Sequence, residues 1–131
     1  MHHAKGTFEV KVIPQAPNGE APAVGRMSLE KQFHGGLAAT SKVEMLTAMT
    51  QVKGSAGYVA IEWVSGALDS RSGAFALQHS GTMTRGVPQL SVTVVPDSGT
   101  EQLTGLFGSM TITITDGKHF YDFEYALTEN S

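Results

Sequence analysis

The chain has 131 residues, of which 40% are hydrophobic, and it carries a net charge of −3. This length suits one domain with a sizeable core, so we predict a single domain over residues 1–131. The slightly acidic balance gives no electrostatic reason to expect a nucleic acid or an anionic membrane as a partner. The absence of cysteine excludes disulfides, thiolate metal sites and cysteine nucleophiles, and it fits a reducing cytoplasm.

The N-terminal stretch MHHAKGTFEV lacks the apolar centre of a signal peptide. No run of about 18 apolar residues follows anywhere in the sequence. We therefore expect a cytoplasmic protein without a membrane segment, and we assign no function to His2 and His3.

Apolar and polar residues alternate with a period of two along most of the chain, and turn residues interrupt the alternation. This pattern predicts an all-β protein. In the second expected strand, Lys31 interrupts a face that otherwise carries Met27, Leu29 and Phe33. The expected strands, in chain order, are 6–14, 25–36, 37–51, 57–69, 72–83, 89–96, 109–115 and 118–127.

The segment 41–51 fits two structures. Ser41 and Glu44 have the spacing of a helix capping box, which favours one short helix. Its many β-branched residues favour a strand instead, and we predict a strand. The turn before this segment also leaves the register open. A two-residue Gly35-Gly36 turn places Phe33 opposite Ala38, whereas matching the apolar faces needs a bulge or a longer loop.

About eight antiparallel strands, each with one apolar face, must bury those faces together. A flat sheet of this size would leave two free edges and one bare hydrophobic face. Closure into a barrel removes both problems, and a two-sheet sandwich is the alternative.

Four phrases between Lys53 and Leu127 match a known pattern: KGSAGYVAIE, SGAFALQHSGTM, VVPDSGT and DGKHFYDFEYAL. From about Phe33 to Leu127 the chain is therefore similar to a family of uncharacterised small bacterial proteins. Such proteins resemble the eight-stranded allene oxide cyclase barrel, lipocalin-like in general shape, so the resemblance implies a barrel and no established activity. The chain departs from the family pattern at Glu101, where a glycine is expected, and at Trp63, where an arginine is expected.

The hairpin around residues 69–72 brings an acid and a histidine together. A two-residue turn at Ser70-Arg71, or a four-residue loop, would place Glu62 directly opposite His79. The same register would place Val64 opposite Leu77 and Gly66 opposite Phe75. Directly opposed side chains are close enough for a carboxylate to bind an imidazole. We therefore predict a Glu62–His79 pair on the inner face of the barrel.

Three more residues are candidates for the same place. Lys31 lies on an inward face, and Tyr121 and Tyr125 add hydroxyls from the last strand. A mostly apolar interior with a few converging polar groups is typical of a small-molecule pocket. The alternative is structural: the pair stabilises the core and the tyrosines fill a narrow barrel.

Ile61 and Trp63 point outward if Glu62 points inward. Large apolar groups exposed on a sheet often mark a subunit contact, so we predict a homo-oligomer, most simply a dimer.

Glu30 and His34 share a face but lie about 13 Å apart along a strand, too far to chelate one ion. Only a cross-strand set of Glu62, His79 and His119 could bind a metal, and we expect neither a metal nor a cofactor.

Three functions remain compatible with these residues. The protein is expected to bind a small apolar or amphipathic molecule in its lumen. One alternative is an isomerase-like or cyclase-like enzyme with Glu62 and His79 as acid–base groups. The other is a packed barrel that acts as an oligomeric interaction module.

Overall fold

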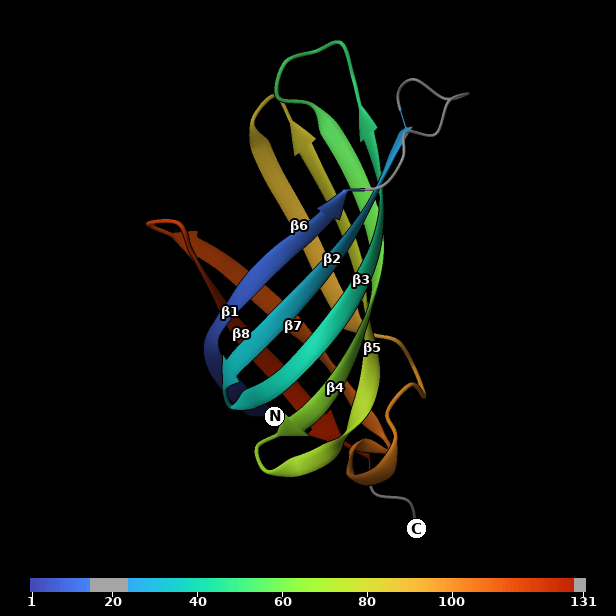
Figure 1. The fold of residues 1–131 in the computed structure, drawn as a ribbon, viewed down its shortest axis with the longest axis vertical. Coiled ribbons are helices and arrows are strands. Elements are labelled where there is room, and N and C mark those ends of the chain that lie inside the picture. The colour runs from blue at the N-terminus through green and yellow to red at the C-terminus, as the bar shows by residue number, and fades with distance from the viewer. Residues whose placement is uncertain (15–23, 129–131) are drawn as a thin grey trace.

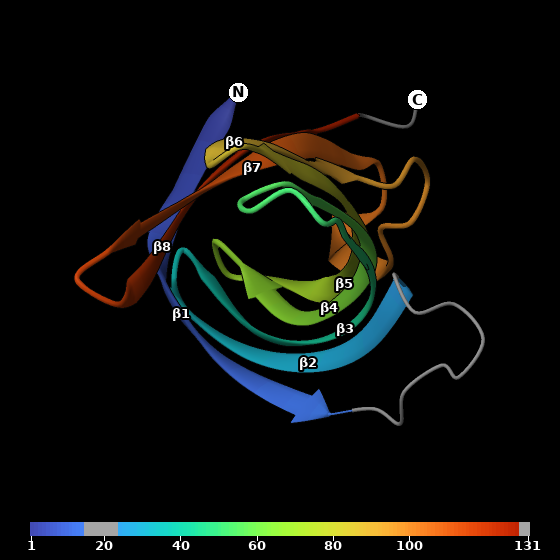
Figure 2. The same ribbon diagram turned by 90° about the horizontal axis from the view of Figure 1, so that it is seen from above.

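The computed structural model describes residues 1–14 and 24–128, which form a closed eight-stranded antiparallel barrel (Figures 1 and 2). Each strand pairs with the next in the chain, and β8 pairs with β1. The predicted barrel is therefore confirmed, and the sandwich alternative is wrong. The strands are β1 (His2–Pro14), β2 (Val24–Gly35), β3 (Leu37–Met49), β4 (Ala56–Leu68), β5 (Arg71–Thr84), β6 (Val87–Val94), β7 (Leu106–Thr115) and β8 (Lys118–Leu127).

The two ends of the barrel differ in packing. At the end where β4 turns into β5, which we call the closed end, large side chains fill the interior. Phe75 and Phe123 stack there with ring centroids 5.7 Å apart. The 3-10 helix η1 (Glu101–Leu103) adds the buried side chain of Leu103. At the other end, the open end, the β3–β4 and β5–β6 hairpins extend beyond the remaining strands (Figure 1). No helix in the described ranges is long and apolar enough to span a membrane.

The seam between β6 and β7 is the weakest pairing in the barrel. Only Thr93 and Ser109 pair across it. The loop after β6 instead continues along β5, where the Thr100 amide donates to the Ala74 carbonyl at 2.8 Å. Glu101 follows in this loop with φ +52°, a left-handed conformation that glycine adopts more easily. This left-handed backbone would suit the glycine that the resemblance leads us to expect at this position.

Segment 41–51 is strand as far as Met49, so the predicted strand is confirmed and the helix alternative is wrong. Its residues alternate between buried and exposed, because one face of β3 lines the barrel interior. Phe33 pairs with Ala39, not Ala38, so the register of a two-residue Gly35-Gly36 turn is wrong and the alternative with a bulge or a longer loop holds.

The hydroxyl of Tyr121 forms hydrogen bonds with the backbone of the β2–β3 turn. It accepts a hydrogen bond from the Leu37 amide at 2.9 Å and donates to the His34 carbonyl at 2.8 Å. Tyr121 therefore satisfies buried backbone groups of a turn that is too irregular to satisfy them itself.

The predicted register of the β4–β5 hairpin is wrong by two residues. Glu62 pairs with Leu77, and His79 pairs with Ala60. The turn consists of Asp69 and Ser70, with φ +45° and +73°, and not of Ser70 and Arg71. Two consecutive left-handed residues make a type I′ turn, which suits the twist of a hairpin but normally contains Asn and Gly. The turn therefore could not be located from its sequence, which lacks the usual Asn and Gly.

Replacing Ser70 with glycine should stabilise the protein. A serine at φ +73° is strained, whereas glycine adopts this conformation freely. We expect Ser70→Gly to raise the free energy of unfolding by about 0.5–1 kcal/mol, measured by urea denaturation.

The matched control is Ser72→Gly, the same change two residues later inside β5. It should lower the free energy of unfolding by about 0.5–1 kcal/mol, because glycine weakens a regular strand. Equal effects of the two substitutions would contradict the assigned turn.

Candidate functional site

The buried polar side chains of the described residues all meet at one place. They are Lys31 on β2, Ser41 on β3, Glu62 on β4 and His79 on β5. We call these four residues the polar network. Its members come from four consecutive strands and lie between the packed closed end and a smaller apolar cluster toward the open end.

Glu62 is the centre of the polar network. Its Oε1 accepts a hydrogen bond from His79 Nε2 at 2.7 Å and one from Lys31 Nζ at 3.1 Å. Its Oε2 accepts one from Ser41 Oγ at 2.6 Å. The Lys31 ammonium also lies 4.9 Å from the centroid of the Phe8 ring, within cation–π range.

The strand positions explain how these side chains meet. Lys31 and Ser41 are direct partners in the β2–β3 ladder. His79 lies diagonally from Glu62 across the β4–β5 ladder, and long side chains can bridge such a diagonal. The direct partner of His79 is Ala60, whose small side chain leaves room for the imidazole. The predicted contact between Glu62 and His79 thus exists, although the register that predicted it was wrong.

The surroundings of Glu62 favour its charged form. Burial by itself raises the pKa of Glu62, but the hydrogen bond from His79, the charge of Lys31 and the hydrogen bond from Ser41 together lower it below its ordinary value. An ionised carboxylate can only accept hydrogen bonds, so Nε2 of His79 must carry a proton. Glu62 and Lys31 balance each other's charge inside the barrel.

An apolar groove of about 470 Å³ opens on the inner faces of β3–β6 at the open end. We call it the open-end groove. Its lining includes Met45, Met49, Tyr58, Met83, Pro88 and Leu90. Met45 is in the same ladder row as Ala60 and His79, so the inner end of the groove lies next to the polar network.

Tyr58 lies between the open-end groove and the polar network. It is half-buried, and it packs across Gly81, where a Cβ atom would collide with its ring. Burial, and to a smaller extent the charge of Glu62, raises the pKa of Tyr58, so its hydroxyl keeps its proton at neutral pH. Tyr58 therefore adds a protonated phenol to the otherwise mostly apolar lining of the groove.

The two tyrosines predicted for the pocket do not join the polar network. The hydroxyl of Tyr121 binds the β2–β3 turn, as described above. The hydroxyl of Tyr125 donates to the Asp69 carboxylate at the closed end. His119 packs against Phe8 with ring centroids 5.0 Å apart and is not a partner of Glu62. Within residues 1–14 and 24–128, no three His, Asp or Glu side chains converge as metal ligands would.

Ser41, Tyr58 and the groove methionines are not among the predicted site residues. Ser41 resembled a helix cap, and only the β2–β3 register places it beside Lys31. The methionines fall mainly on apolar faces, which is typical of core residues, but Met49 and Met83 are 66% and 42% exposed at the open end.

The outer wall carries two further features. Ile61 and Trp63 point outward as predicted, and with Leu46 and Val59 they form a contiguous apolar surface in which each side chain is about half exposed. We call these four residues the outer patch.

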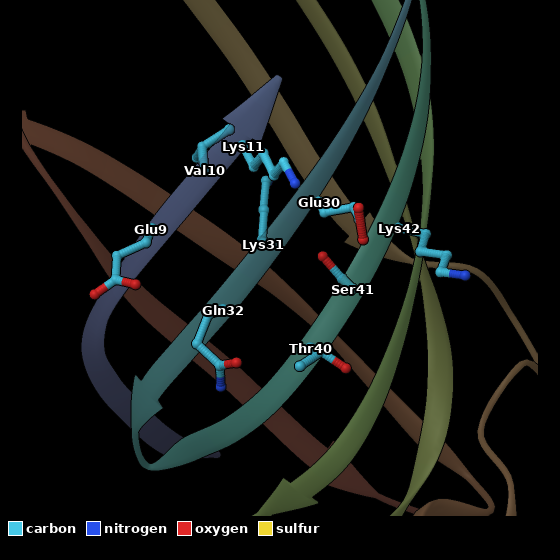
Figure 3. Close-up of a pocket in the computed structure, with 9 residues that line it drawn as sticks. All are labelled: Glu9, Val10, Lys11, Glu30, Lys31, Gln32, Thr40, Ser41 and Lys42. Carbon is cyan, nitrogen blue, oxygen red and sulfur yellow. The ribbon is translucent and has the colours of Figure 1, made fainter. Parts of the chain in front are cut away.

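A polar hollow of about 520 Å³ lies over β1–β3 (Figure 3). Its exposed residues Glu9, Lys11 and Lys42 carry both signs of charge. Glu9 and Lys42 point away from each other in the close-up. The hollow therefore favours neither an anionic nor a cationic ligand.

Replacing Glu62 with glutamine should destabilise the protein by about 3–5 kcal/mol at neutral pH, because Lys31 would be left as an uncompensated buried charge. The folded state holds the Glu62 pKa below its ordinary value of 4.5, so the unfolded state binds the proton more readily. The stabilisation by Glu62 is therefore complete above pH 4.5 and disappears as the pH falls through the folded-state pKa. The free energy of unfolding of wild type and of Glu62→Gln should be measured by urea denaturation across this pH range. The difference between the two proteins should become smaller as the pH falls.

Glu44→Gln is the control, because Glu44 is exposed on the outer face of β3. It should change the free energy of unfolding by less than about 0.5 kcal/mol. A difference between wild type and Glu62→Gln that stays constant with pH would contradict an ionised Glu62.

Comparison with known proteins gives a family and no activity. A search of curated proteins found no match. A crystal structure of a protein with unknown function from the DUF3224 family of Shewanella oneidensis MR-1 has the same fold, with a TM-score of 0.93. That protein is 50% identical in sequence, and the match covers 99% of each chain. The family model described as protein of unknown function (DUF3224) matches residues 4–125, and the chain therefore belongs to this family.

Proposed function

We propose that the protein binds a small apolar molecule in the open-end groove. The observation that carries this proposal is the contrast between the two ends of the barrel. The closed end is filled by its own side chains, whereas the inner faces of β3–β6 at the open end leave an apolar space of about 470 Å³. A concave, mostly apolar space with few polar groups is the usual form of a small-molecule site.

The composition of the groove supports the same function. Met45, Met49 and Met83 lie on its wall. Methionine side chains are flexible and polarisable, so they adapt to ligands of different shape. Glu62 already accepts three hydrogen bonds from neighbouring side chains, so we assign it no role as a catalytic base and propose binding alone. We also propose a cytoplasmic location, which the cysteine-free composition fits.

A neutral solvatochromic dye such as Nile red tests the groove. We expect the wild-type protein to bind it with a rise in dye fluorescence. Leu90→Asp should weaken binding about tenfold or more, because it places a charge on the apolar wall of the groove.

Ser91→Asp is the matched control, because it adds the same charge to the exposed, opposite face of β6. It should leave dye binding unchanged. Binding that both substitutions weaken equally, or no binding by the wild type, would refute the open-end groove as the site.

We also propose that the outer patch binds a second copy of the chain. Each of its four side chains is about half exposed, although all are large and apolar. Lys42 pairs with Trp63 in the β3–β4 ladder, and Glu44 pairs with Ile61. Opposite charges thus flank the same surface, and a two-fold arrangement can place Lys42 of one copy against Glu44 of the other.

Trp63 is the only tryptophan and reports directly on the outer patch. On raising the protein concentration, we expect its emission to shift to shorter wavelength while the sedimentation coefficient rises to that of a dimer. Ile61→Lys should abolish both changes. Thr111→Lys, an exposed change on β7, should abolish neither. Sedimentation as a monomer at all micromolar concentrations would exclude this dimer.

A further inference from the structure

We propose that the protein docks on anionic lipid membranes through the ends of two neighbouring hairpins. These ends are residues 49–55, where β3 turns into β4, and residues 83–87, where β5 turns into β6. We call these residues the hairpin tip. Both parts project from the open end of the barrel (Figure 1). The inference goes beyond ligand binding in the open-end groove, and the docking does not depend on a bound ligand.

Every large apolar side chain of the hairpin tip is exposed. These side chains are Met49, Val52, Met83 and Val87, and they are between 42% and 67% exposed. Exposed apolar groups that gather on one part of a surface often mark contact with a protein or a membrane. The hairpin tip therefore has the apolar part of a docking surface.

The charges of the hairpin tip are all positive. Lys53 and Arg85 are exposed there, and residues 49–55 and 83–87 include no Asp or Glu. Glu44 is the last acid before the tip and lies five residues from Met49, about 17 Å along β3. Salt screens exposed charges over about 8 Å, so Glu44 does not cancel the charge of the tip. The net charge of −3 for the whole chain therefore does not describe this end of the molecule.

Hydrogen bonds join the two parts of the hairpin tip. The Gly86 amide donates to the Gly54 carbonyl at 2.9 Å, and the Arg85 amide donates to the Ser55 hydroxyl at 3.0 Å. The Ser55 amide also donates to the Val52 carbonyl at 3.1 Å, which closes a turn around Lys53. Both basic residues thus belong to one ordered unit. Docking does not have to order two separate loops, which lowers its entropic cost.

The shape of the hairpin tip suits a lipid surface better than a protein surface. A stable protein interface buries about 800 Å² on each partner, which a projection with four large apolar side chains does not readily supply. A bilayer needs no matching surface. Apolar side chains enter the headgroup layer, while Lys and Arg keep their charged ends in water beside the lipid phosphates.

Docking in this way would set the open-end groove against the bilayer, because Met49 and Met83 belong both to the hairpin tip and to the wall of the groove. An apolar molecule would then pass between lipid and groove with little exposure to water. This consequence rests on the proposed function, whereas the docking itself does not.

Co-sedimentation with vesicles tests the inference. One set of vesicles contains phosphatidylcholine alone, and the other contains equal parts of phosphatidylcholine and phosphatidylglycerol. We expect the wild type to bind the anionic vesicles at least about tenfold more tightly, because two basic residues approach the charged surface. Raising the salt concentration should remove this preference, since salt screens the attraction between surface charges.

Lys53→Gln combined with Arg85→Gln should also remove the preference for anionic vesicles, because it removes both charges of the hairpin tip. The matched control is Lys5→Gln combined with Arg71→Gln. It makes the same change in net charge at two exposed positions near the closed end, and it should leave the preference intact.

Val52→Ser tests the apolar contribution. It should weaken binding to the anionic vesicles about tenfold, because an apolar side chain no longer enters the headgroup layer. Val59→Ser is the control. Val59 is 53% exposed, as Val52 is, but it lies on the outer wall of β4, and its replacement should leave vesicle binding unchanged.

No binding of the wild type to the anionic vesicles, or equal binding to both sets, would overturn the inference. Equal losses in the two double variants would overturn it as well. A self-associated form that Val52→Ser dissociates would assign the hairpin tip to a second copy of the chain instead of a membrane. Dye binding in solution without vesicles measures the open-end groove separately, so failure of the docking and failure of the proposed function are distinguishable.

Discussion

The arrangement of the strands depends on one constraint: the buried carboxylate of Glu62 must receive hydrogen bonds. Glu62 is fully buried on β4, where an isolated charge would cost several kcal/mol. Its three donors come from β2, β3 and β5, so satisfying the carboxylate requires four strands in one relative register. A shift of any of these strands would remove a donor and leave a buried charge exposed to apolar surroundings. The polar network therefore specifies the barrel as much as it stabilises it.

The alternation of residues was sufficient to predict the strands and the direction of their side chains. It placed Glu62, His79 and Lys31 inside and Trp63 outside, as the structure has them. It did not give the register, because register depends on the turns. The Asp69-Ser70 turn has no glycine to mark its left-handed backbone. The Glu62–His79 contact was predicted despite the wrong register, since long side chains reach diagonal as well as direct partners.

The sequence was less informative about where an inward side chain lies along the barrel axis. Met110 and Met83 both occupy inward positions, but Met110 is buried near the closed end and Met83 is 42% exposed at the open end. A period-two pattern is the same in both cases. What differs is the number of neighbouring strands at that height, and this follows from strand lengths and from the β6–β7 seam. The open-end groove could not be predicted before those were known.

The position of the polar network between the two ends has a chemical consequence. The Glu62 carboxylate accepts three hydrogen bonds and lies beside the Lys31 ammonium, so its bonding capacity is used within the protein. The groove methionines are flexible, whereas the side chains of the polar network are fixed by their hydrogen bonds to Glu62. The barrel should therefore adapt its shape at the open end and stay rigid at its centre.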